Sequence, residues 1–540
     1  MTVFKSRIQP GSEAFQQNRA DMLALVDKLT ELNGRARRMS EKRRERFEAR
    51  GQLTPRERLA RLLDPGMPWM AIGNIAGYLS DGRPEEKSFA GSTVISGIGF
   101  IGGVRCMIVV DDSGIMAGAM TASTGYKIIR SEQIALEQKL PYVHLVESAG
   151  GDLINYTVEG FVAGGALFGG QAKLSKAGIP VISVLHGSST AGGAYMPGMS
   201  DYVVAVKGRG KAFLAGPPLL KAATGEIATE DELGGAEMHA SVSGLAEYLA
   251  ENDGEAIIMA REVIDRLGWN TRCFMPDISE APPPIYDPDE IAGVVPVDYR
   301  KPYDVREVVA RIVDGSDFAD FKPRYGVSTV CMQASIMGHR CGLIGNNGPI
   351  DPAGATKTTQ FLQLMDQADT PVIFLQNTTG YMVGLEYERA GMIKHGSKMI
   401  QAVTNIEVPR ITLQIGASFG AGNYGMCGRA FEPDFLFSWP NAATGVMGGQ
   451  QAATVMSIVA EGAAKAAGKE PDRDALAKQE AHLTQLFDGQ SGAFYTSGRN
   501  LDDGVIDPRD TRKVLGFLLA TVSEARHRDV RENSFGIARM

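Results

Sequence analysis

The stretch Gly178-Ile-Pro-Val-Ile-Ser-Val-Leu-His-Gly187-Ser-Ser-Thr-Ala-Gly-Gly-Ala-Tyr195 returns later in the chain as Val408-Pro-Arg-Ile-Thr-Leu-Gln-Ile-Gly416-Ala-Ser-Phe-Gly-Ala-Gly-Asn-Tyr424. In both copies a Pro opens an apolar run, a Gly lies seven places after it, two small residues lie at plus twelve and plus thirteen, and a Tyr lies at plus fifteen. An apolar run bounded by such turn residues is typical of a buried strand. The chain therefore contains the same strand and turn twice.

The duplication extends over most of the chain. Residues 139–150 are matched by residues 369–380, and residues 56–64 by residues 306–314. The offset falls from 250 residues (Arg56 to Arg306) to 229 residues (Pro180 to Pro409). Solenoid repeats have periods of roughly 20 to 50 residues, so this spacing predicts two homologous domains instead.

Size and composition agree with two domains in one globular chain. The 540 residues exceed the roughly 250 to 300 at which a single core stops growing. A formal charge of −8 gives no basic field for nucleic acid. No apolar run approaches the roughly 18 residues of a membrane span, and the start lacks the apolar region of a signal peptide, so we expect a cytoplasmic protein without membrane or nucleic-acid partners. The five cysteines form no C-x-x-C pair, which predicts reduced core thiols.

The expected organisation has four parts. Residues 1–50 form an N-terminal helical arm, residues 51–280 the N-terminal domain, residues 281–300 a linker and residues 301–540 the C-terminal domain. Prolines are dense between 276 and 302, so we expect neither a helix nor a central strand there. Short runs rich in Val and Ile alternate with helical stretches in each half, which is the pattern of an α/β fold with buried strands.

The predicted arm carries a basic stretch at residues 35–46. Because acidic residues are interleaved with the basic ones, a solvated helical face is one interpretation. Contact with a phosphate-bearing ligand or a partner subunit is the other.

Two nucleotide-binding patterns can be set aside. Gly97-Ile-Gly-Phe-Ile-Gly102 has the letters of the dinucleotide fingerprint, but an apolar strand-like run follows it instead of a helix. We therefore expect a β-hairpin turn there. No Walker motif is present, so the sequence shows no ATP-binding loop.

Gly416-Ala-Ser-Phe-Gly420 matches the G-x-S-x-G pattern of serine hydrolases and follows a predicted strand. A thioesterase or other hydrolase using Ser418 is therefore an alternative function. Its weakness is the missing base, because His482 and His527 lie in polar, charged helical sequence.

The small pairs that follow the repeated strands are Gly192-Gly193 and Ala421-Gly422. A strand that leads through small residues into a helix presents backbone N–H groups where the helix dipole favours an oxyanion. Small residues let a planar carbonyl group reach the backbone. The other interpretation is that these are close-packed turns without a chemical role.

The chain resembles the carboxyltransferase β subunits of biotin-dependent acyl-CoA carboxylases, in the methylcrotonoyl-CoA and geranyl-CoA branch. The resemblance covers about residues 20–530, and five motifs carry it: residues 190–195, 213–225, 377–384, 420–428 and 446–449. It implies two tandem homologous crotonase-like domains built from ββα superhelical repeats, as in the ClpP/crotonase fold. It also implies a homo-hexamer of β subunits, in which the N domain of one subunit faces the C domain of another.

Residue roles follow from the same resemblance. Gly192 and Gly193 are implied to hold the acyl-CoA thioester oxygen, and Ala421 and Gly422 the ureido oxygen of carboxybiotin. The further residues implied on the acyl-CoA side are Gly150, Gly151, Ala191, Ala194, Tyr195, Gly164 and Gly169. Those implied on the biotin side are Thr379, Gly380, Phe419, Gly420, Asn423 and Tyr424.

The resemblance also implies a partner. The chain has no Ala-Met-Lys-Met biotinylation motif and no ATP-binding half. We therefore expect biotin to be carried covalently by a separate biotin carboxylase α subunit, in an α6β6 complex. In that mechanism biotin takes the substrate proton, so no side-chain base is needed, and no metal is expected on this chain.

The acyl group is suggested by residues 163–170, which read Ala-Gly-Gly-Ala-Leu-Phe-Gly-Gly. Methylcrotonoyl-type subunits carry bulky aromatic residues there. Glycine at 164 or 169 would widen the acyl pocket, so we favour a longer branched enoyl-CoA resembling geranyl-CoA. The alternative is 3-methylcrotonoyl-CoA or another short acyl-CoA, with the glycines serving close helix packing.

Overall fold

The computed structural model describes residues 4–80, 82, 84–86, 88, 90–152, 154–275, 280–468 and 470–537, so Pro276 of the predicted Pro-rich segment lies outside the described residues. The chain divides into two compact units. The N-terminal unit comprises Glu31–Pro276, Gly498–Asn500 and Thr521–Met540, and the C-terminal unit comprises Met1–Thr30, Asp277–Ser497 and Leu501–Ala520. Each unit is therefore completed by a segment from the opposite end of the chain.

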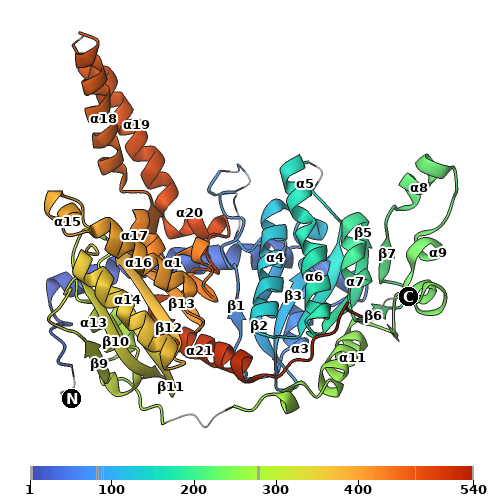
Figure 1. Ribbon diagram of the computed structural model, residues 1–540. Coiled ribbons are helices and arrows are strands. Elements are labelled where there is room, and N and C mark those ends of the chain that lie inside the picture. Colours follow the sequence, from blue (N-terminus) through green and yellow to red (C-terminus); the bar gives the residue numbers. More distant parts are fainter. Residues whose placement is uncertain are drawn as a thin grey trace. The chain divides into compact units, whose positions relative to one another are not determined.

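The N-terminal unit contains an eight-stranded sheet in the order β1-β2-β3-β4-β5-β6-β8, with β7 paired to β5 (Figure 1). The pairs β1-β2 and β2-β3 are antiparallel, and the others are parallel. Every residue of β3 and β4 is buried, as expected for parallel strands covered on both faces. The strands are β1 Met70–Ala71, β2 Val94–Ile101, β3 Val104–Asp111, β4 Tyr142–Ser148, β5 Val181–Thr190, β6 Tyr202–Val206, β7 Lys211–Phe213 and β8 Tyr248–Ala250.

The C-terminal unit repeats this plan in a seven-stranded sheet of order β14-β13-β12-β11-β10-β9, with β15 paired to β13. Again the first two pairings along the chain are antiparallel and the rest are parallel. The predicted α/β fold with two repeated halves is confirmed. The strands are β9 Phe318–Phe321, β10 Thr329–Ile336, β11 His339–Asn346, β12 Val372–Thr378, β13 Arg410–Phe419, β14 Phe435–Ser438 and β15 Ala443–Gly445.

Helices of the N-terminal unit connect and cover its strands. They are α2 Arg44–Ala49, α3 Pro55–Leu62, α4 Ala122–Glu137, α5 Val158–Gly164, α6 Ala166–Lys176, α7 Tyr195–Gly198, α8 Pro217–Thr224, α9 Glu230–Gly234, α10 Ala236–Met238 and α11 Asp253–Arg266. The shorter 3-10 and π turns are η1 Met116–Gly118, η2 Ala191–Ala194, η3 His239–Ser243 and η4 Trp269–Arg272. The start of α3 follows local capping rules, because Thr54 and Glu57 form a capping box there and Pro55 occupies the first helical position.

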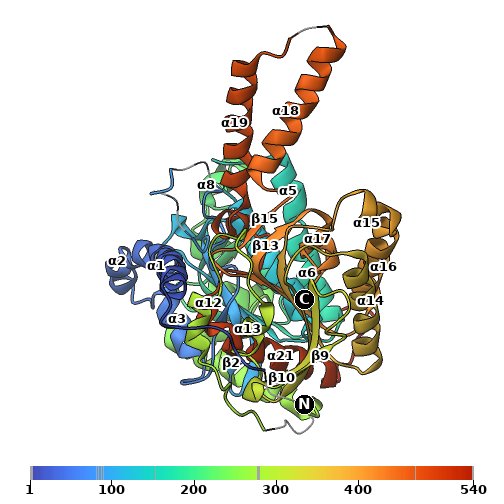
Figure 2. The same ribbon diagram turned by 90° about the vertical axis from the view of Figure 1, so that its left-hand side faces the viewer.

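In the C-terminal unit, α14 and α16 lie side by side (Figure 2). Apolar side chains from both helices, including Phe361 and Met399, form one core with Ile344 and Phe374 of the sheet. The helices are α12 Ile291–Val294, α13 Val305–Val309, α14 Pro352–Gln367, α15 Leu385–Arg389, α16 Met392–Asn405, α17 Gly420–Gly425, α18 Gly449–Ala466 and α19 Arg473–Ser491, with turns η5 Pro288–Glu290, η6 Asp314–Ser316, η7 Arg429–Phe431 and η8 Pro508–Asp510. Residues of α1 Glu13–Glu41, α20 Ala493–Gly498 and α21 Thr511–His527 belong to both units.

In each unit an aspartate accepts hydrogen bonds from the turn of a β-hairpin, and this shared arrangement supports the duplication at the atomic level. In the N-terminal unit, Asp64 accepts hydrogen bonds from the backbone N–H groups of Gly102 and Gly103, in the β2-β3 turn, and from Arg261. In the C-terminal unit, Asp314 accepts from the N–H groups of Met337 and Gly338, in the β10-β11 turn, and pairs with Arg512. The expected β-hairpin after Gly97 is thus present, and the two halves fix their hairpins in the same way.

Two local expectations need correction. The N-terminal arm expected at residues 1–50 is not one continuous helix, because α1 ends at Glu41 and α2 begins at Arg44. The Pro-rich segment does contain short helices, η5 and α12, although its proline density argued against them. Pro288 stands at the first helical position of η5, where its missing N–H costs nothing.

The basic residues of the predicted arm are partly paired inside the N-terminal unit. Arg35 and Arg38 form ion pairs with Glu31 at 2.9 and 2.8 Å. Arg44 pairs with Glu57 at 2.7 Å, and its hydrogen bond holds the pKa of the Glu57 carboxyl at about 2. These contacts explain part of the charge bias without a ligand.

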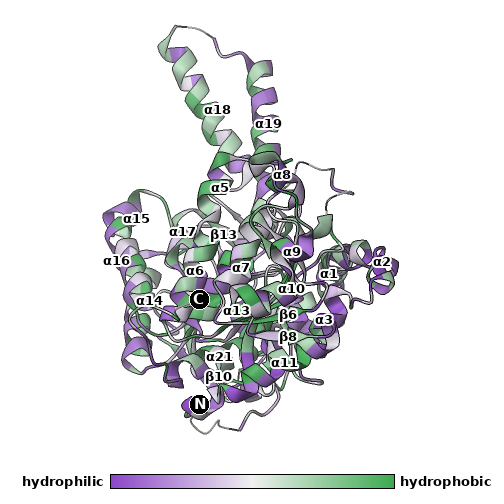
Figure 3. Cartoon of the chain, turned by 90° about the vertical axis from the view of Figure 1, so that its right-hand side faces the viewer, coloured by the Kyte–Doolittle hydropathy of each residue, from purple (hydrophilic) through white to green (hydrophobic). Residues whose placement is uncertain are grey.

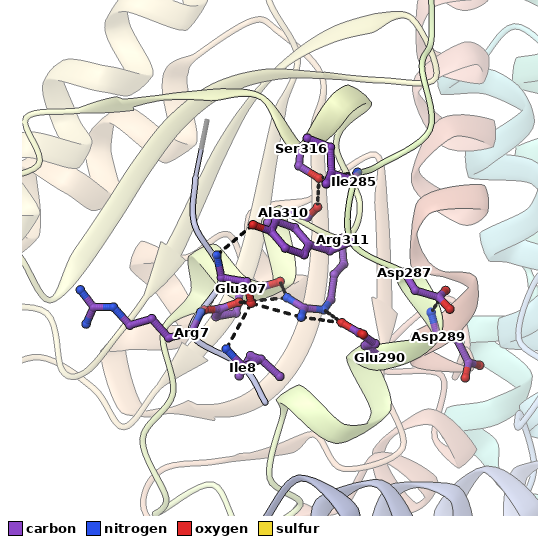
Figure 4. Close-up of polar contacts among 12 residues, drawn as sticks. Arg7, Ile8, Ile285, Asp287, Asp289, Glu290, Glu307, Ala310, Arg311 and Ser316 are labelled. Atoms are coloured by element: carbon purple, nitrogen blue, oxygen red, sulfur yellow. Dashed lines mark hydrogen bonds and ion pairs between the residues drawn. The ribbon is translucent and has the colours of Figure 1, made fainter. Parts of the chain in front are cut away.

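The start of the chain is held in the C-terminal unit by a charged network (Figure 4). Glu307 accepts hydrogen bonds from Ser6 Oγ at 2.6 Å, from Arg7 N at 2.7 Å and from Arg311 Nη1 at 2.9 Å. Arg311 also donates to Glu290 at 2.7 Å. Because the Arg311 and Glu307 charges are buried, removing Arg311 would leave Glu307 without a positive partner in the interior.

Within the described ranges, no helix combines the length and the apolar content needed to span a bilayer. All five cysteines are free thiols, and only Cys273 is not fully buried. The prediction of core thiols is confirmed for the other four.

Candidate functional site

Both sheets change register at the same repeat position. Between β4 and β5 the pairing shifts between Val146 and Ser148, and between β12 and β13 it shifts between Gln376 and Thr378. Such a bulge bends the strand and re-aims the residue that follows it. The ends of β4 and β12 therefore depart from regular strand geometry in the same way.

In the N-terminal unit, the end of β4 is fixed by Ser148. Its hydroxyl donates to Gly118 O at 2.8 Å and accepts from Gly150 N at 3.2 Å. Gly150 has a φ of 85°, and a Cβ added there would lie 2.9 Å from Thr190 O. Only glycine fits this position. Gly151, the next residue, is exposed.

The small pair of the N-terminal unit lies in η2, directly after β5. Gly193 is buried, and a Cβ on it would lie 2.8 Å from Ser189 Oγ. Gly192 is exposed, and the nearest atom to an added Cβ is Phe168 Cζ at 3.7 Å. The second glycine of the pair is thus tightly packed, whereas the first faces open space.

The C-terminal unit repeats this arrangement in α17. Thr378 Oγ1 accepts from Gly380 N at 3.2 Å. Gly422 is buried, and a Cβ on it would lie 2.9 Å from both Gly380 Cα and Thr378 Cγ2. Ala421, like Gly192, is exposed.

The residue that opens each turn has a left-handed backbone. Ala191 has a φ of 52°, and Gly420, at the same repeat position, has a φ of 54°. A left-handed conformation costs an alanine about 1 to 3 kcal/mol, and such strain is concentrated at functional sites. The chain keeps this geometry even where its residue is not glycine.

The predicted tyrosines occupy equivalent places. Tyr195 and Tyr424 are each 47% exposed. The Tyr195 ring lies edge-on to Phe168, with centroids 5.5 Å apart, and Tyr424 lies beside Phe431 at 5.6 Å. Each turn is thus flanked by one half-exposed aromatic ring.

The chemical capacity of these turns comes from their backbone. The first N–H groups of a helical turn have no acceptor within the turn, and they carry the positive end of the peptide dipoles. The residues around them are glycine and alanine, so the approach is not blocked by large side chains. Each unit can therefore stabilise one negatively charged carbonyl oxygen.

The remaining predicted site residues differ in whether their side chains are free to contact a ligand. Phe419 is buried with its ring 5.1 Å from that of Tyr299. The Asn423 side chain donates inward to Ser418 Oγ at 2.8 Å. These two residues could offer a ligand mainly their backbone, whereas Thr379 is exposed and Ala194 is half-buried.

Gly164 and Gly169 lie on α5 and α6 of the N-terminal unit, and a Cβ added at either one would contact nothing within 4 Å. Gly170 is different, because a Cβ there would collide with the carboxyl group of Glu132. Close packing within the chain therefore accounts for Gly170 but not for Gly164 or Gly169.

Ser418 is arranged as a structural hydroxyl. It is fully buried, donates to Gln376 Oε1 at 2.6 Å and accepts from Asn423 Nδ2. Both contacts are amides, which cannot accept a proton as a general base would. Ser189, its repeat equivalent, is also fully buried. This geometry does not fit a hydrolytic nucleophile.

Replacing Ser418 by Ala should lower the free energy of unfolding by about 1 to 3 kcal/mol, because Gln376 and Asn423 lose their buried partner. Thermal unfolding of the variant measures this loss. In parallel, a fluorophosphonate probe should leave the unmodified protein unlabelled. A probe adduct on Ser418, found by mass spectrometry, would restore the hydrolase interpretation.

The N-terminal unit also contains a buried ion network on the strands β4 and β5, which lead into the glycine turns, and the sequence patterns did not predict it. Arg58 donates to Glu147 at 2.5 Å and to Asp253 at 3.0 Å, and His186 Nδ1 lies 2.9 Å from Asp253 Oδ1. Burial lowers the pKa of His186. Burial raises the pKa of a carboxyl, but the His186 hydrogen bond and the Arg58 charge outweigh it and hold the pKa of Asp253 at about 2. Glu147 and His186 are titratable residues within strands whose first parts are mainly apolar, a signal that could have located the network.

Comparison with known proteins places the chain among similar sequences. The family model "Carboxyl transferase domain" matches residues 46–534. The solved β subunit of geranyl-CoA carboxylase from P. aeruginosa is 50% identical, with a TM-score of 0.93 and 100% of each chain covered. A Mycobacterium tuberculosis protein named "Probable biotin-dependent acyl-coenzyme A carboxylase beta2 subunit" is 46% identical over 540 residues, 100% of both chains. The biotin-dependent 3-methylcrotonyl-coenzyme A carboxylase beta1 subunit of the same organism is 41% identical over 514 residues, 93% of this chain and 94% of that one.

Proposed function

The chain belongs to the carboxyl transferase family and is a β subunit of a biotin-dependent acyl-CoA carboxylase, and from this premise we propose that its N-terminal unit binds the acyl-CoA thioester and its C-terminal unit binds carboxybiotin. The observation that carries the proposal is the repeated turn, with one set of backbone donors in each unit. Carboxyl transfer develops negative charge on two carbonyl oxygens, one in each reactant. Two preorganised donor sets meet these two needs.

On the acyl-CoA side, we assign the thioester oxygen to the backbone N–H groups of Gly192 and Gly193. The packing of Gly193 against Ser189 fixes the turn before the substrate arrives, so little reorganisation is needed during the reaction. Gly150, Gly151, Ala191, Ala194 and Tyr195 surround the turn and are assigned to the same site.

The acyl chain is assigned to the face of α5 and α6. Gly164 and Gly169 leave space there that a bulky side chain could fill. Nearby apolar residues of α5 are strongly exposed, with Phe161 at 73% and Val162 at 72%. Exposed apolar surface next to open space suits a long hydrocarbon chain.

We therefore propose geranyl-CoA, or an enoyl-CoA of similar length and branching, as the substrate. The similarity to a geranyl-CoA carboxylase β subunit, 50% identical, supports this choice over the 3-methylcrotonyl-CoA relative, 41% identical. The retained alternative is 3-methylcrotonoyl-CoA or another short acyl-CoA.

On the biotin side, the residues fit a ureido carbonyl group. A side chain at Gly422 would strike Gly380 and Thr378, so the two loops approach each other only because position 422 is glycine. When bound, carboxybiotin supplies the carboxyl group that is transferred. The N–H groups of Ala421 and Gly422 are assigned to its ureido oxygen, with Thr379, Gly380, Phe419, Gly420, Asn423 and Tyr424 around them.

Two partners complete the proposal. Biotin is carried by a separate α subunit, as the biotin-dependent relatives suggest. The chain itself forms a homo-hexamer within an α6β6 complex. The hairpin of α18 and α19 supports an interface, because α18 is coloured mainly white to green along its length (Figure 3), and Ile458 and Val459 are 64% and 58% exposed. Exposed apolar patches of this kind mark association surfaces.

Replacing Ile458 and Val459 together by Asp should weaken self-association of the β chain at least about 10-fold, because two charges would have to be desolvated in an apolar contact. Analytical ultracentrifugation over a concentration series measures the shift towards smaller species. Gln451→Asp on the same helix is the control, since Gln451 is exposed and polar. If the double variant sediments like the unmodified protein, α18 is not part of the interface.

The test of the function is a reconstituted reaction. The purified chain is mixed with a biotin-loaded biotin carboxylase subunit, ATP, bicarbonate and a series of acyl-CoA esters from propionyl to geranyl, and carboxylated products are identified by mass. Geranyl-CoA as the best acceptor supports the whole proposal. Preference for 3-methylcrotonoyl-CoA keeps the enzyme class and overturns the substrate, and failure with every ester overturns the proposed reaction.

A further inference from the structure

The C-terminal sheet contains a row of polar side chains that the N-terminal sheet lacks. Gln376, Gln414 and Ser438 lie opposite one another on β12, β13 and β14, and all three are buried. The equivalent register in the N-terminal unit is occupied by Val146, Leu185 and Ala205. The fold itself therefore does not require a polar row at this level.

The row is joined to the proposed biotin side at two points. Gln376 accepts from Ser418 and donates to Met426 O at 2.6 Å, next to the end of α17. Gln414 Oε1 accepts from Thr444 Oγ1 at 3.1 Å. Thr444 lies on β15 opposite Ser418, where the N-terminal unit has Ala212 opposite Ser189. The polar row thus ties β15 to the strand that leads into α17.

The far end of the row is a buried carboxyl group. Asp502 is 4% exposed, and its Oδ2 lies 2.7 Å from Ser438 Oγ. Its Oδ1 accepts from Gly504 N at 3.0 Å. Of the charged groups near it, Asp503 adds negative charge, while Arg429 pairs with Asp503 and not with Asp502. Burial, with a smaller effect of Asp503, outweighs the hydrogen bonds from Ser497 and Ser438 and raises the pKa of Asp502 to about 7.

The number of hydrogens decides how this end of the row is connected. Ser438 has two acceptors within reach, Asp502 Oδ2 at 2.7 Å and Gln414 Oε1 at 3.1 Å, but its hydroxyl carries one hydrogen. If Asp502 is ionised, Ser438 donates to it and releases Gln414. If Asp502 carries a proton, the carboxyl donates to Ser438, Ser438 donates to Gln414, and every contact of the row is made.

We propose that Asp502 is a positioning residue whose protonated form completes a hydrogen-bonded row through Ser438 and Gln414 to Thr444, and that this row holds β15 against the strand that carries the biotin-side turn. The role rests on the proposed function, because it assigns that turn to carboxybiotin. The row is found only in the unit to which this half of the reaction is assigned. Ionisation of Asp502 removes the Ser438 contact, one of the two hydrogen bonds to Gln414 Oε1. The Gln414 amide that holds Thr444 is then less firmly fixed, which loosens β15 and slows transfer.

Three variants, each assayed in the complete complex of α and β subunits, test the hydrogen bonds of the row one at a time. Asp502→Asn keeps a donor towards Ser438 but cannot ionise. Ser438→Ala introduces the residue that the same fold accepts at Ala205, and Thr444→Val removes only the last hydroxyl at nearly constant volume. We expect Ser438→Ala and Thr444→Val to lower kcat about 10-fold, with less than a twofold change in KM for acyl-CoA. Asp502→Asn should keep the kcat of the unmodified enzyme below about pH 7 and lose its decline above that pH.

Two readouts do not depend on activity. Infrared difference spectra of the β chain should show a protonated carboxyl band that disappears as the pH rises from about 6 to about 9 and is absent from Asp502→Asn. Hydrogen exchange of residues 441–446 should speed up over the same range in the unmodified protein only. Absence of the band, or exchange independent of pH, overturns the inference even if the enzyme transfers carboxyl groups. If instead the band and exchange behave as expected but no acyl-CoA is carboxylated, the proposed function fails and not the proton row.

Discussion

Replacing Gly193 or Gly422 by Val is expected to lower carboxyl transfer by about 100-fold to 1,000-fold, a loss of about 2.7 to 4 kcal/mol of transition-state stabilisation for each displaced donor. The first side-chain carbon would already meet Ser189 Oγ at 2.8 Å in one case and Gly380 Cα at 2.9 Å in the other. The turn must move to relieve either contact, so its N–H groups no longer point at the developing charge. The rate of product formation by the reconstituted complex measures the effect.

The two variants should fail in different ways. Both variants lower carboxyl transfer to acyl-CoA, but Gly193→Val should leave the release of CO2 from carboxybiotin intact, whereas Gly422→Val should slow that release and leave acyl-CoA binding intact. Gly198→Ala is the control, because its added carbon contacts nothing within 4 Å and the residue is not assigned to the site, and it should stay within about threefold of the unmodified rate. Full activity in a folded Gly193→Val or Gly422→Val variant would mean that these turns do not bind the reacting oxygens.

The second large effect concerns the acyl chain. Replacing Gly169 by Phe should lower kcat/KM for geranyl-CoA about 100-fold, close to 2.7 kcal/mol, while changing kcat/KM for 3-methylcrotonoyl-CoA less than about threefold. A side chain at this position enters open space in the chain, so it should fill the pocket without disturbing the core. Steady-state kinetics with both esters give the ratio directly.

Gly489→Ala on α19 provides the control for this experiment, since it adds one carbon where nothing lies within 4 Å, outside the assigned acyl pocket. It should leave the ratio between the two esters nearly unchanged. Thermal unfolding of Gly169→Phe should match that of the unmodified chain, in contrast to any enlargement of Gly170, which is packed against Glu132. Equal losses with both esters would show that the space at Gly169 does not select the acyl chain.

The sequence predicted the repeated strands and turns because these depend on short-range order. A proline, an apolar run and small residues at fixed spacing specify a buried strand and a turn whatever the rest of the chain does. The strand pairing shifts register after Val146 in one half and after Gln376 in the other, so both halves contain the same bulge, as the repeat implied. The G-x-S-x-G letters could not be judged in the same way, because burial of Ser418 and its contact with Gln376 involve a strand 42 positions earlier.

The amino-acid sequence by itself thus determined the duplicated α/β fold and the family to which the chain belongs. Only the tertiary structure decided which glycines are packed and which face open space, since Gly170 packs against Glu132 of another helix, whereas an added carbon at Gly164 or Gly169 meets nothing within 4 Å. It alone brought Asp502 to Ser438, 64 positions away in the chain. Spacing within a segment is set by local backbone geometry, whereas a side chain's burial and hydrogen-bond partners are set by distant segments that meet only when the sheets assemble.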